Sequence, residues 1–341
     1  MKNRLILTCV QFLRKFIPNN YTQNFLIVST TGLGDSLWAT PALQSLKTSF
    51  PASRITLLTT PTGEQVLRHN PWVDQTIVFK DPLLPHLFSL WKQLRREKIG
   101  TVLCLHASQR LALPLCSLIG ATRIIGTFGI NKGLDDLLTN SLHNSYQHEI
   151  VRRLEIVEII GAARTTEALS YFPTQEELSS ASTEPFIALH PGSKDTYKRW
   201  PIDHFVTVGR HLQQLGHNIL ITGTPEERPL MNQLAEQIPN AKLADSTLSL
   251  RSFAALLARA SLLISNDTGP VHLAIALNTP VIALYSPTNP SLCGPHTAKN
   301  AIALAKPPTC TPCLKRKCKA PFCLLQIGPE EVLTHVSNTP V

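Results

Sequence analysis

The segment Ser265–His272, Ser-Asn-Asp-Thr-Gly-Pro-Val-His, places a carboxylate and a hydroxyl beside a glycine and a proline. The apolar run Leu262–Ile264 precedes it and another follows, which predicts a strand, a tight turn and the start of a helix. Asp267 is a typical N-cap residue, and Gly269 and Pro270 suit a first helical turn whose N–H groups lack partners. Such donors, with the helix dipole, bind phosphate. Taken alone, the segment fits an ordinary capped helix better than an anion site.

A similar junction lies near the start of the chain. The apolar run Phe25–Ser29 leads into Gly32-Leu-Gly34-Asp35, and a helix is predicted over residues 37–46. In open α/β sheets, ligands bind at the carboxyl ends of strands, where such junctions lie. Asp35 therefore has two interpretations from spacing alone, an N-cap carboxylate or a group that faces a ligand.

The glycines near Asp35 do not form a dinucleotide fingerprint. A G-x-G-x-x-G motif that began at Gly32 would need glycine where Leu37 stands. The acidic residue expected about 20 positions later is also missing from Arg54–Leu58. These departures argue against a nicotinamide-dependent oxidoreductase.

Two further turns follow strands in the second half. The strand Phe186–Leu189 leads into His-Pro-Gly192-Ser193, and Lys198 follows shortly after. Small residues let backbone amides approach a phosphate, and a lysine supplies a point charge, although a solvated loop lysine is the alternative. The next turn, residues 222–227, ends in Glu227. A carboxylate there can bond ribose hydroxyls or only favour the first turn of a helix.

The elements that must position these turns alternate between apolar strands and helical patterns in both halves. Repeated alternation of this kind predicts an α/β fold with two doubly wound, mainly parallel sheets. The polar stretch 173–185 predicts a linker, with a hinge near residue 180. We therefore expect a 1–24 N-terminal extension, a 25–175 Rossmann-like domain and a 176–341 Rossmann-like domain, with a C-terminal helix that can pack back on the first domain.

Composition is consistent with this architecture. A length of 341 residues favours two domains, and 43% hydrophobic with 16% charged residues excludes disorder. No apolar run approaches the ~20 residues of a membrane span. The net charge of +9 suits nucleic acid, anionic lipid or a phosphorylated substrate. Nucleic acid is the weakest of the three, because the basic residues are mostly scattered and no recognition motif is present.

Residues 1–24 predict an amphipathic helix. Its apolar side comprises Leu5, Ile6, Cys9, Phe12, Leu13, Phe16 and Ile17, with cationic residues at the edges. This pattern fits a helix on an anionic membrane surface and, equally, a helix packed on the body of the protein. A secretory signal fits poorly, because polar residues interrupt the apolar region and no small-residue cleavage site follows.

Four of the eight cysteines are clustered in sequence. Their order is Cys310-x2-Cys313-x4-Cys318-x4-Cys323. Four thiolates at such spacing can hold a structural zinc. The second C-x-x-C pair typical of zinc sites is missing, so free or paired cysteines are favoured over zinc.

Together, the turns resemble a known family. Gly34-Asp35-Ser36-Leu37-x-x-Thr40-Pro41-Ala42-Leu43 resembles the opening motif of family 9 glycosyltransferases, the heptosyltransferases of lipopolysaccharide core assembly. Its donor-site motifs resemble three other segments of this chain, which are His190-Pro191-Gly192-Ser193, Lys198-x-Trp200-Pro201 and Asn266-Asp267-Thr268-Gly269-Pro270-x-His272-Leu273-Ala274. The resemblance runs in the right order from about Phe25 to about Val336.

The resemblance implies a GT-B fold, in which two Rossmann-like domains face a central cleft, with the acceptor on the N-terminal domain and the donor on the C-terminal one. It implies inverting transfer of heptose from ADP-heptose to the lipid A–Kdo type inner core of lipopolysaccharide, with no catalytic metal or other cofactor required. Such an enzyme is cytoplasmic and suits the cytoplasmic face of the inner membrane.

The resemblance implies a role for each site residue from its position in the sequence. Asp35 is expected as the general base, and Gly32 and Gly34 form the loop on the acceptor side. Lys198 is expected to neutralise the leaving diphosphate, and Glu227 to bond the ribose. The remaining donor-side residues are Gly192, Ser193, Asp267, Thr268, Gly269 and His272.

The chain also departs from the family pattern. Thr30-Thr31-Gly32-Leu33 stands where members often carry a basic residue, and residues 1–24 are not part of the core pattern. Two alternatives therefore stay open: the same fold using another nucleotide sugar or acceptor, and an inactive GT-B-like nucleotide-binding protein. The presence of both Asp35 and Lys198 argues against the inactive form.

Overall fold

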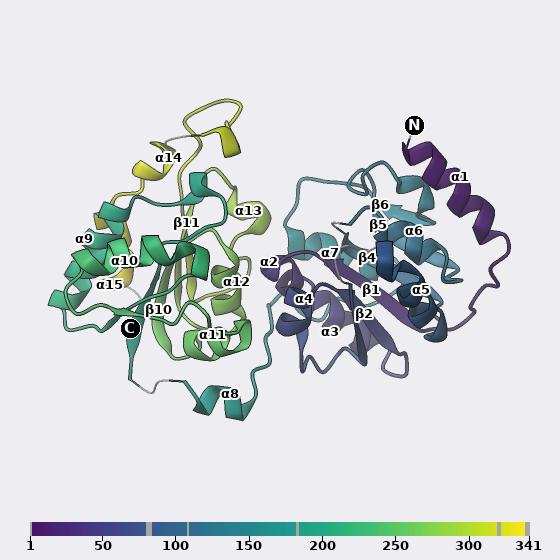
Figure 1. Ribbon diagram of the computed structural model, residues 1–341, viewed down its shortest axis with the longest axis horizontal. Coiled ribbons are helices and arrows are strands. Elements are labelled where there is room, and N and C mark those ends of the chain that lie inside the picture. The colour runs from purple at the N-terminus through teal and green to yellow at the C-terminus, as the bar shows by residue number, and fades with distance from the viewer. Residues whose placement is uncertain (1, 80–83, 108, 182–183, 319–321, 338–341) are drawn as a thin grey trace. The chain divides into compact units, whose positions relative to one another are not determined.

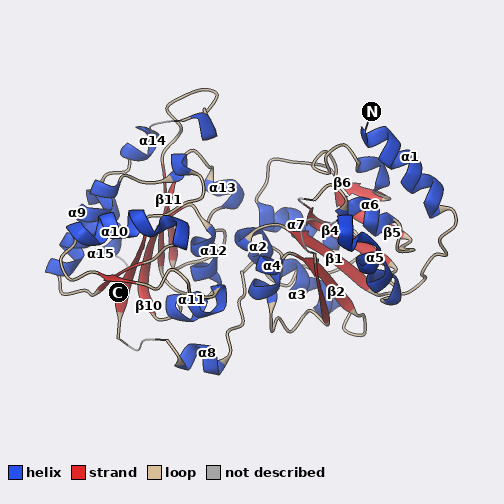
Figure 2. Ribbon diagram, viewed as in Figure 1, coloured by secondary structure: helices blue, strands red, loops and turns tan. Residues whose placement is uncertain are grey.

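The computed structural model describes residues 2–79, 84–107, 109–181, 184–318 and 322–337. The chain forms two compact units, Met1–Glu167 (unit 1) and Ala168–Val341 (unit 2) (Figure 1). Each unit contains one six-stranded parallel sheet with helices around it (Figure 2). The predicted pair of doubly wound α/β domains is confirmed.

The sheet of unit 1 has the strand order β3-β2-β1-β4-β5-β6. The elements of this unit are α1 (Lys2–Arg14), β1 (Phe25–Thr30), α2 (Leu33–Trp38), α3 (Thr40–Ser49), β2 (Ile55–Thr59), α4 (Pro61–Leu67), β3 (Gln75–Val78), η1 (Leu84–His86), α5 (Leu87–Arg96), β4 (Thr101–Ala107), α6 (Ala112–Ser117), β5 (Arg123–Thr127), η2 (Asp135–Leu137), β6 (Asn140–Leu142) and α7 (Glu149–Glu158).

The sheet of unit 2 has the order β12-β11-β10-β7-β8-β9. Its elements are α8 (Gln175–Ser179), β7 (Phe186–His190), η3 (Thr196–Lys198), α9 (Ile202–Gln214), β8 (Ile219–Ile221), η4 (Pro225–Glu227), α10 (Arg228–Gln237), β9 (Lys242–Leu243), α11 (Leu250–Leu257), β10 (Ala260–Asn266), α12 (Gly269–Ala276), β11 (Val281–Tyr285), α13 (Pro290–Cys293), β12 (Ala301–Ala305), η5 (Lys315–Lys317), α14 (Phe322–Leu325) and α15 (Pro329–Ser337).

The central strands are apolar runs because both faces of each sheet are covered. Every residue of β1, β2, β7 and β11 is buried, as expected for parallel strands between two helical layers. In unit 1, α1, α5 and α6 contribute side chains to the core on one face. In unit 2, α9, α10 and α15 do the same.

The strand order of each sheet reverses at one point. In unit 1 this switch point lies between β1 and β4, and in unit 2 it lies between β7 and β10. The connections that leave the two strands there run to opposite sides, so the carboxyl ends leave room for a ligand. The Asp35 loop follows β1, and the turns with Gly192 and Asp267 follow β7 and β10.

Several predicted helix boundaries differ from the structure. The single helix expected over residues 37–46 is divided into α2 and α3 at Ala39. Pro41 explains the division, since it occupies the first turn of α3, where its missing N–H costs nothing. Asp35 consequently lies in the first turn of α2, whose N-cap is Gly32.

The polar stretch 173–185 does not begin as a linker. It starts with the short helix α8, in which Thr174 and Glu177 form a capping box. Glu177 also pairs with Arg251 of α11. These contacts attach the stretch to unit 2, and the contact boundary falls after Glu167. The last helix, α15, contacts α9 and β11, so it packs within unit 2.

Candidate active site

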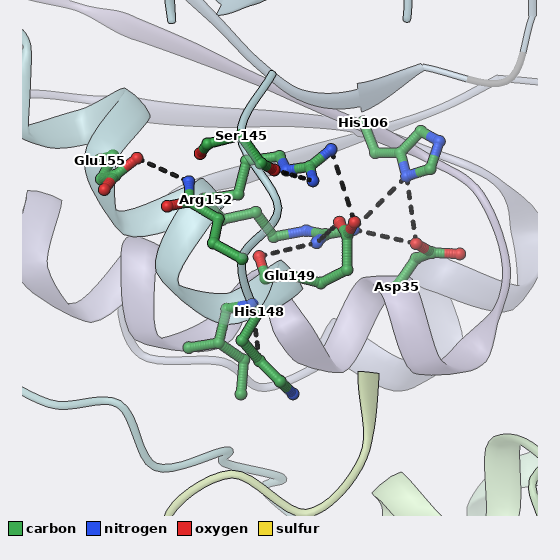
Figure 3. Close-up of polar contacts among 10 residues, drawn as sticks. Asp35, His106, Ser145, His148, Glu149, Arg152 and Glu155 are labelled. Carbon is green, nitrogen blue, oxygen red and sulfur yellow. Dashed lines mark hydrogen bonds and ion pairs between the residues drawn. The ribbon is translucent and has the colours of Figure 1, made fainter. Parts of the chain in front are cut away.

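Asp35 belongs to a compact polar cluster in unit 1, formed with His106, Glu149 and Arg153 and called here the base cluster (Figure 3). One Asp35 oxygen, Oδ1, accepts a bond of 2.9 Å from Arg153 Nη2 and lies 3.1 Å from His106 Nδ1. Arg153 Nη1 donates to Glu149 Oε2 at 2.6 Å. The four residues come from α2, the end of β4 and α7.

Arg153 holds the cluster together from inside the protein. Its side chain is fully buried, and its guanidinium carbon lies 5.3 Å from the centre of the Trp38 ring. A buried cation is tolerated only when carboxylates and hydrogen bonds compensate its charge. Glu149 compensates it from the same helix, and Asp35 compensates it from α2. The position of the Asp35 carboxylate is therefore set by the core of unit 1.

His106 reaches the cluster through an irregularity in β4. The pairing with β1 joins Val28 to Cys104 and then Ser29 to His106, so β4 carries one extra residue there. Such a bulge changes the direction in which the next side chain points. His106 thus lies at the switch point beside Asp35, with part of its ring exposed.

The base cluster keeps Asp35 ionised. Burial by itself would raise the pKa of Asp35, but the hydrogen bond with His106 and the positive charge of Arg153 outweigh it and hold the pKa at about 2. The carboxylate is therefore free to accept a proton at neutral pH, although a low pKa makes it a weak base when it acts alone.

Gly32 and Gly34, which the sequence assigned to an acceptor-side loop, lie next to Asp35 at the start of α2. Gly32 is exposed, and a Cβ atom there would meet no other atom within 4 Å. Close packing among the described residues therefore does not require glycine at position 32. Gly34 follows inside α2, one residue before Asp35.

In unit 2, Lys198 and Asp267 form a close ion pair. Lys198 Nζ donates to Asp267 Oδ2 at 2.6 Å. Burial would lower the pKa of Lys198, but the Asp267 carboxylate and this hydrogen bond raise it above its ordinary value. The amino group is therefore charged at neutral pH.

Asp267 is not the N-cap that the sequence predicted. The helix α12 begins at Gly269, and Thr268 is its N-cap, without a side-chain capping bond. Asp267 lies one residue earlier because β10 extends to Asn266. Its carboxylate is thereby available to Lys198. The structure brings Lys198, Asp267, Thr268 and Gly269 together at the amino end of α12.

Polar atoms near this helix terminus lack partners within the protein. Among the described residues, Thr268 Oγ1, Tyr285 Oη and Ser286 Oγ are buried and form no hydrogen bond. Burial raises the pKa of Tyr285 above its ordinary value, and the charge of nearby Asp267 adds to the shift. Buried hydroxyls without partners are rare in folded proteins. Such groups at a helix N-terminus are suited to an anionic ligand.

Asn266 fixes the loop that carries Lys198. It is fully buried, and its Nδ2 donates to the carbonyls of Pro191 at 2.8 Å and Gly192 at 3.2 Å. Its Oδ1 accepts from the Trp200 backbone N–H at 2.8 Å. One amide therefore joins the end of β10 to both sides of the loop after β7.

Glu227 is buried against Gly192. A Cβ atom at Gly192 would lie 2.2–2.4 Å from the Glu227 carboxyl atoms, so only glycine permits this contact. Glu227 Oε2 accepts from the Thr224 N–H at 2.9 Å and lies 3.9 Å from His190 Nε2. Burial lowers the pKa of His190, although the charge of Glu227 opposes the shift. Glu227 therefore has a structural capping role, and ribose binding stays a prediction.

Ser193 and His272 are both buried. The Ser193 carbonyl accepts from Arg199 Nε at 2.9 Å, which links it to the Lys198 loop. His272 lies within α12, three residues after Gly269. Direct contact of either side chain with a donor stays a prediction.

Sequence reasoning missed His106, Arg153 and the role of Asn266. His106 directly follows the apolar run Val102–Leu105, so the rule that ligands gather at strand ends would have identified it. Arg153 gives no such signal, because Arg152 stands beside it in the sequence and nothing local distinguishes the two. Asn266 belongs to one of the recognised motifs, but its side chain bonds a loop 75 residues away in sequence, and the motif does not predict that contact.

Cys310, Cys313 and Cys323 of the clustered cysteines are free thiols in the structure. Among the described residues, no group of three or more His, Cys, Asp or Glu side chains is arranged to hold a metal ion. Burial raises the pKa of Cys104 to about 12, which keeps that core thiol neutral.

Solved structures share this architecture. A family 9 glycosyl transferase from Veillonella parvula matches with a TM-score of 0.80 and 24% identity over 94% of this chain and 98% of that one. The ADP-heptose lps heptosyltransferase II of Escherichia coli matches with a TM-score of 0.75 and 19% identity over 92% and 98%. The two units therefore have the GT-B fold of these structures.

The sequence comparison gives the family. The profile of glycosyltransferase family 9 (heptosyltransferase) matches residues 87–323, more than half of the chain. Lipooligosaccharide heptosyltransferase 2 of Haemophilus influenzae is 24% identical over 308 residues, which cover 82% of this chain and 88% of the relative. The chain belongs to glycosyltransferase family 9, and the resemblance drawn from its motifs is confirmed.

Replacement of Arg153 by methionine tests the origin of the low Asp35 pKa. Loss of the cation should raise this pKa from about 2 by about one unit or more. The measurement is a ¹³C NMR titration of the Asp35 carboxyl group. Arg152→Met is the control, since Arg152 bonds Glu149 and the Ser145 carbonyl and should leave the pKa unchanged. An unchanged pKa in Arg153→Met would remove Arg153 from this role.

Asn266→Ala tests the loop attachment. It leaves one N–H and two carbonyls without their partner, so we expect a loss of about 2 kcal/mol or more in the free energy of unfolding. Urea denaturation measures it. Asn218→Ala removes one exposed bond to the Pro185 carbonyl and should cost less than about 1 kcal/mol. Equal losses in both variants would contradict the role of Asn266.

Proposed function

We propose that the protein is an inverting glycosyltransferase that transfers a heptose from ADP-heptose to the inner core of lipopolysaccharide, of the lipid A–Kdo type, without a metal ion. The observation that carries the proposal is the placement of opposite charges at the two switch points. Unit 1 presents an ionised carboxylate in contact with a histidine, and unit 2 presents a lysine beside a helix N-terminus.

The reaction forms a bond between an acceptor oxygen and C1 of the sugar, and it breaks the bond between C1 and the diphosphate. Attack on the face of C1 opposite the diphosphate inverts the configuration. The acceptor hydroxyl must lose a proton, and the departing diphosphate must be stabilised. The two sets of charged residues match these two requirements.

Asp35 is proposed to receive the proton of the acceptor hydroxyl. Arg153 and Glu149 fix its carboxylate, and the low pKa ensures that it is ionised before the acceptor binds. Because such a carboxylate is a weak base, the adjacent His106 ring is proposed to share the proton. Gly32 and Gly34 leave space for the acceptor beside this pair.

Lys198 and the amino end of α12 are proposed to bind the diphosphate. Lysine and unpaired backbone N–H groups can carry the negative charge of the leaving group. Asp267 holds Lys198 in the absence of a ligand, and the nucleotide must exchange with it. Gly192 and Ser193 are proposed to line the phosphate site, and Glu227 to bond the ribose.

Relatives support the donor and the acceptor. The names of the matching proteins specify ADP-heptose and lipopolysaccharide or lipooligosaccharide. We propose that the protein works at the cytoplasmic face of the inner membrane, where such an acceptor is anchored. No helix in the described parts of the chain is long and apolar enough to cross a membrane. Another nucleotide sugar or acceptor on the same fold is the second candidate.

Calorimetric titration with ADP, UDP, GDP and NAD, in the presence of EDTA, tests the donor. We expect ADP to bind at least tenfold more tightly than the others, with an affinity that added Mg²⁺ does not change. Preference for UDP or GDP would replace the donor but keep the fold-based proposal. If no nucleotide bound, the transferase proposal would fail.

Paired substitutions separate the two proposed roles. Asp35→Asn keeps the size of the side chain and should lower kcat by about 100-fold or more, with ADP affinity changed less than twofold. Lys198→Ala should weaken ADP binding by about tenfold or more, because it leaves Asp267 without its cation beside the phosphates. Transfer assays and calorimetry distinguish the two. Full turnover in Asp35→Asn would place the base elsewhere.

A further inference from the structure

The N-terminal helix α1 is fixed to unit 1 by one face. Val10 is buried, and Ile6 and Leu7 pack against the same core. Asn3 Nδ2 donates to the Lys132 carbonyl at 2.9 Å, and Arg14 donates to the Ala121 carbonyl at 3.4 Å. Because both ends of the helix are attached, α1 cannot rotate its other face inward.

The packed face differs from the one that the sequence suggested. The predicted apolar side combined Ile6 with Leu5 and Phe12, but only Ile6 of these three meets the core. Val10, outside that predicted side, is the most deeply buried residue of the helix. The helix therefore has two apolar faces, of which one packs on unit 1 and the other is exposed.

The second face stays exposed and is called here the outer stripe. It consists of Leu5, Cys9, Phe12, Leu13 and Phe16. Leu5, Phe12 and Phe16 are 68%, 59% and 71% exposed. The rings of Phe12 and Phe16 lie 5.2 Å apart, edge to face, so they form one apolar projection. Tyr21, 85% exposed, follows shortly after.

Positive charge accompanies the outer stripe. No acidic residue occurs before Asp35, whereas Arg4, Arg14 and Lys15 lie on or directly after the described helix. Residues 1–167 hold 18 Lys and Arg against 11 Asp and Glu, which is +7 of the net +9 of the chain. An apolar helix face with cationic edges binds to anionic lipid interfaces.

A hollow lined mostly by polar and charged side chains lies next to α1. It has a volume of about 420 Å³, and Gln11, Arg14, Lys15, Ile17, Asn19 and Thr122 line it. Arg14 and Lys15 supply cations there, and the two amide side chains supply further donors. A phosphate group carried by a lipid beside the outer stripe matches this lining.

We propose that the outer stripe is a membrane-docking surface, which inserts Leu5, Phe12 and Phe16 among anionic phospholipids while the hollow at Arg14 and Lys15 receives a headgroup phosphate. A second copy of the chain is a poorer occupant for two reasons. Its stripe carries the same cations, which repel. A single helix face is also small beside the ~800 Å² that each partner buries in a stable interface.

This proposal goes beyond the proposed function, on which it rests only for the choice of a membrane that carries the acceptor. It predicts binding to bare lipid, with no acceptor and no nucleotide. The test is co-sedimentation of the full chain with vesicles of 70% phosphatidylethanolamine and 30% phosphatidylglycerol (roughly), compared with phosphatidylcholine vesicles. We expect stronger binding to the anionic vesicles, and a decrease with added salt.

The double variant Phe12→Ser/Phe16→Ser should lower the partition coefficient on anionic vesicles by about tenfold or more, since two aromatic rings no longer enter the lipid. The matched control is Leu215→Ser/Phe322→Ser in unit 2, where the side chains are 61% and 63% exposed, and it should bind like the native chain. Thermal unfolding confirms that both variants stay folded, as expected for exposed positions.

Three results would overturn the proposal. They are unchanged binding in Phe12→Ser/Phe16→Ser, an equal loss in the control, and a dimer of the native chain in light scattering that the variant converts to monomer. ADP affinity and transfer to a soluble acceptor fragment should be unaffected by the stripe variant. A failure of docking is therefore distinguishable from a failure of the proposed function.

Discussion

The reversal of strand order in each parallel sheet is the constraint on which the sites of this protein depend. Parallel strands end at the same edge, and only at the switch point do the neighbouring connections diverge. Asp35 follows β1 and His106 lies at the end of β4, and these two strands are the pair at the switch point of unit 1. The turns that lead to Lys198 and Asp267 follow β7 and β10, the corresponding pair of unit 2. Each switch point therefore brings together two side chains that are more than 60 residues apart in sequence.

Each switch point holds a carboxylate paired with a cation, but the two pairs differ in whether the cation can release its carboxylate. Arg153 is fully buried and also bonds Glu149, so it cannot leave Asp35. Lys198 keeps a fifth of its side chain exposed, and described residues give its Nζ only Asp267 as a hydrogen-bond partner. In the proposed reaction, a diphosphate replaces Asp267 at Lys198. The first pair then stabilises the charge of the proposed base, and the second fixes the cation proposed to bind the donor.

The sequence predicted the fold well because most strands are buried on both faces and are therefore continuous apolar runs. The edge strands β6, β9 and β12 were not predicted. Each of them includes exposed residues, and β6 and β9 are only three and two residues long. The turns with Lys198 and Asp267 were found because glycine and proline mark them. Arg153 could not be found, because its burial depends on α7 packing against α2 and α3. No local pattern encodes that packing.

The uneven charge of the two units matches the kinds of ligand proposed for them. A nucleotide diphosphate is small, so one lysine and one helix terminus in unit 2 suffice, and the rest of that unit is nearly neutral, with 14 basic and 12 acidic residues in 168–341. An acceptor carried by an anionic membrane is extended, and no single residue can neutralise it. Distributed positive charge acts over about 8 Å at physiological salt and needs no fixed partner. Unit 1, with its excess of seven positive charges, is therefore the unit suited to the lipid side of the reaction.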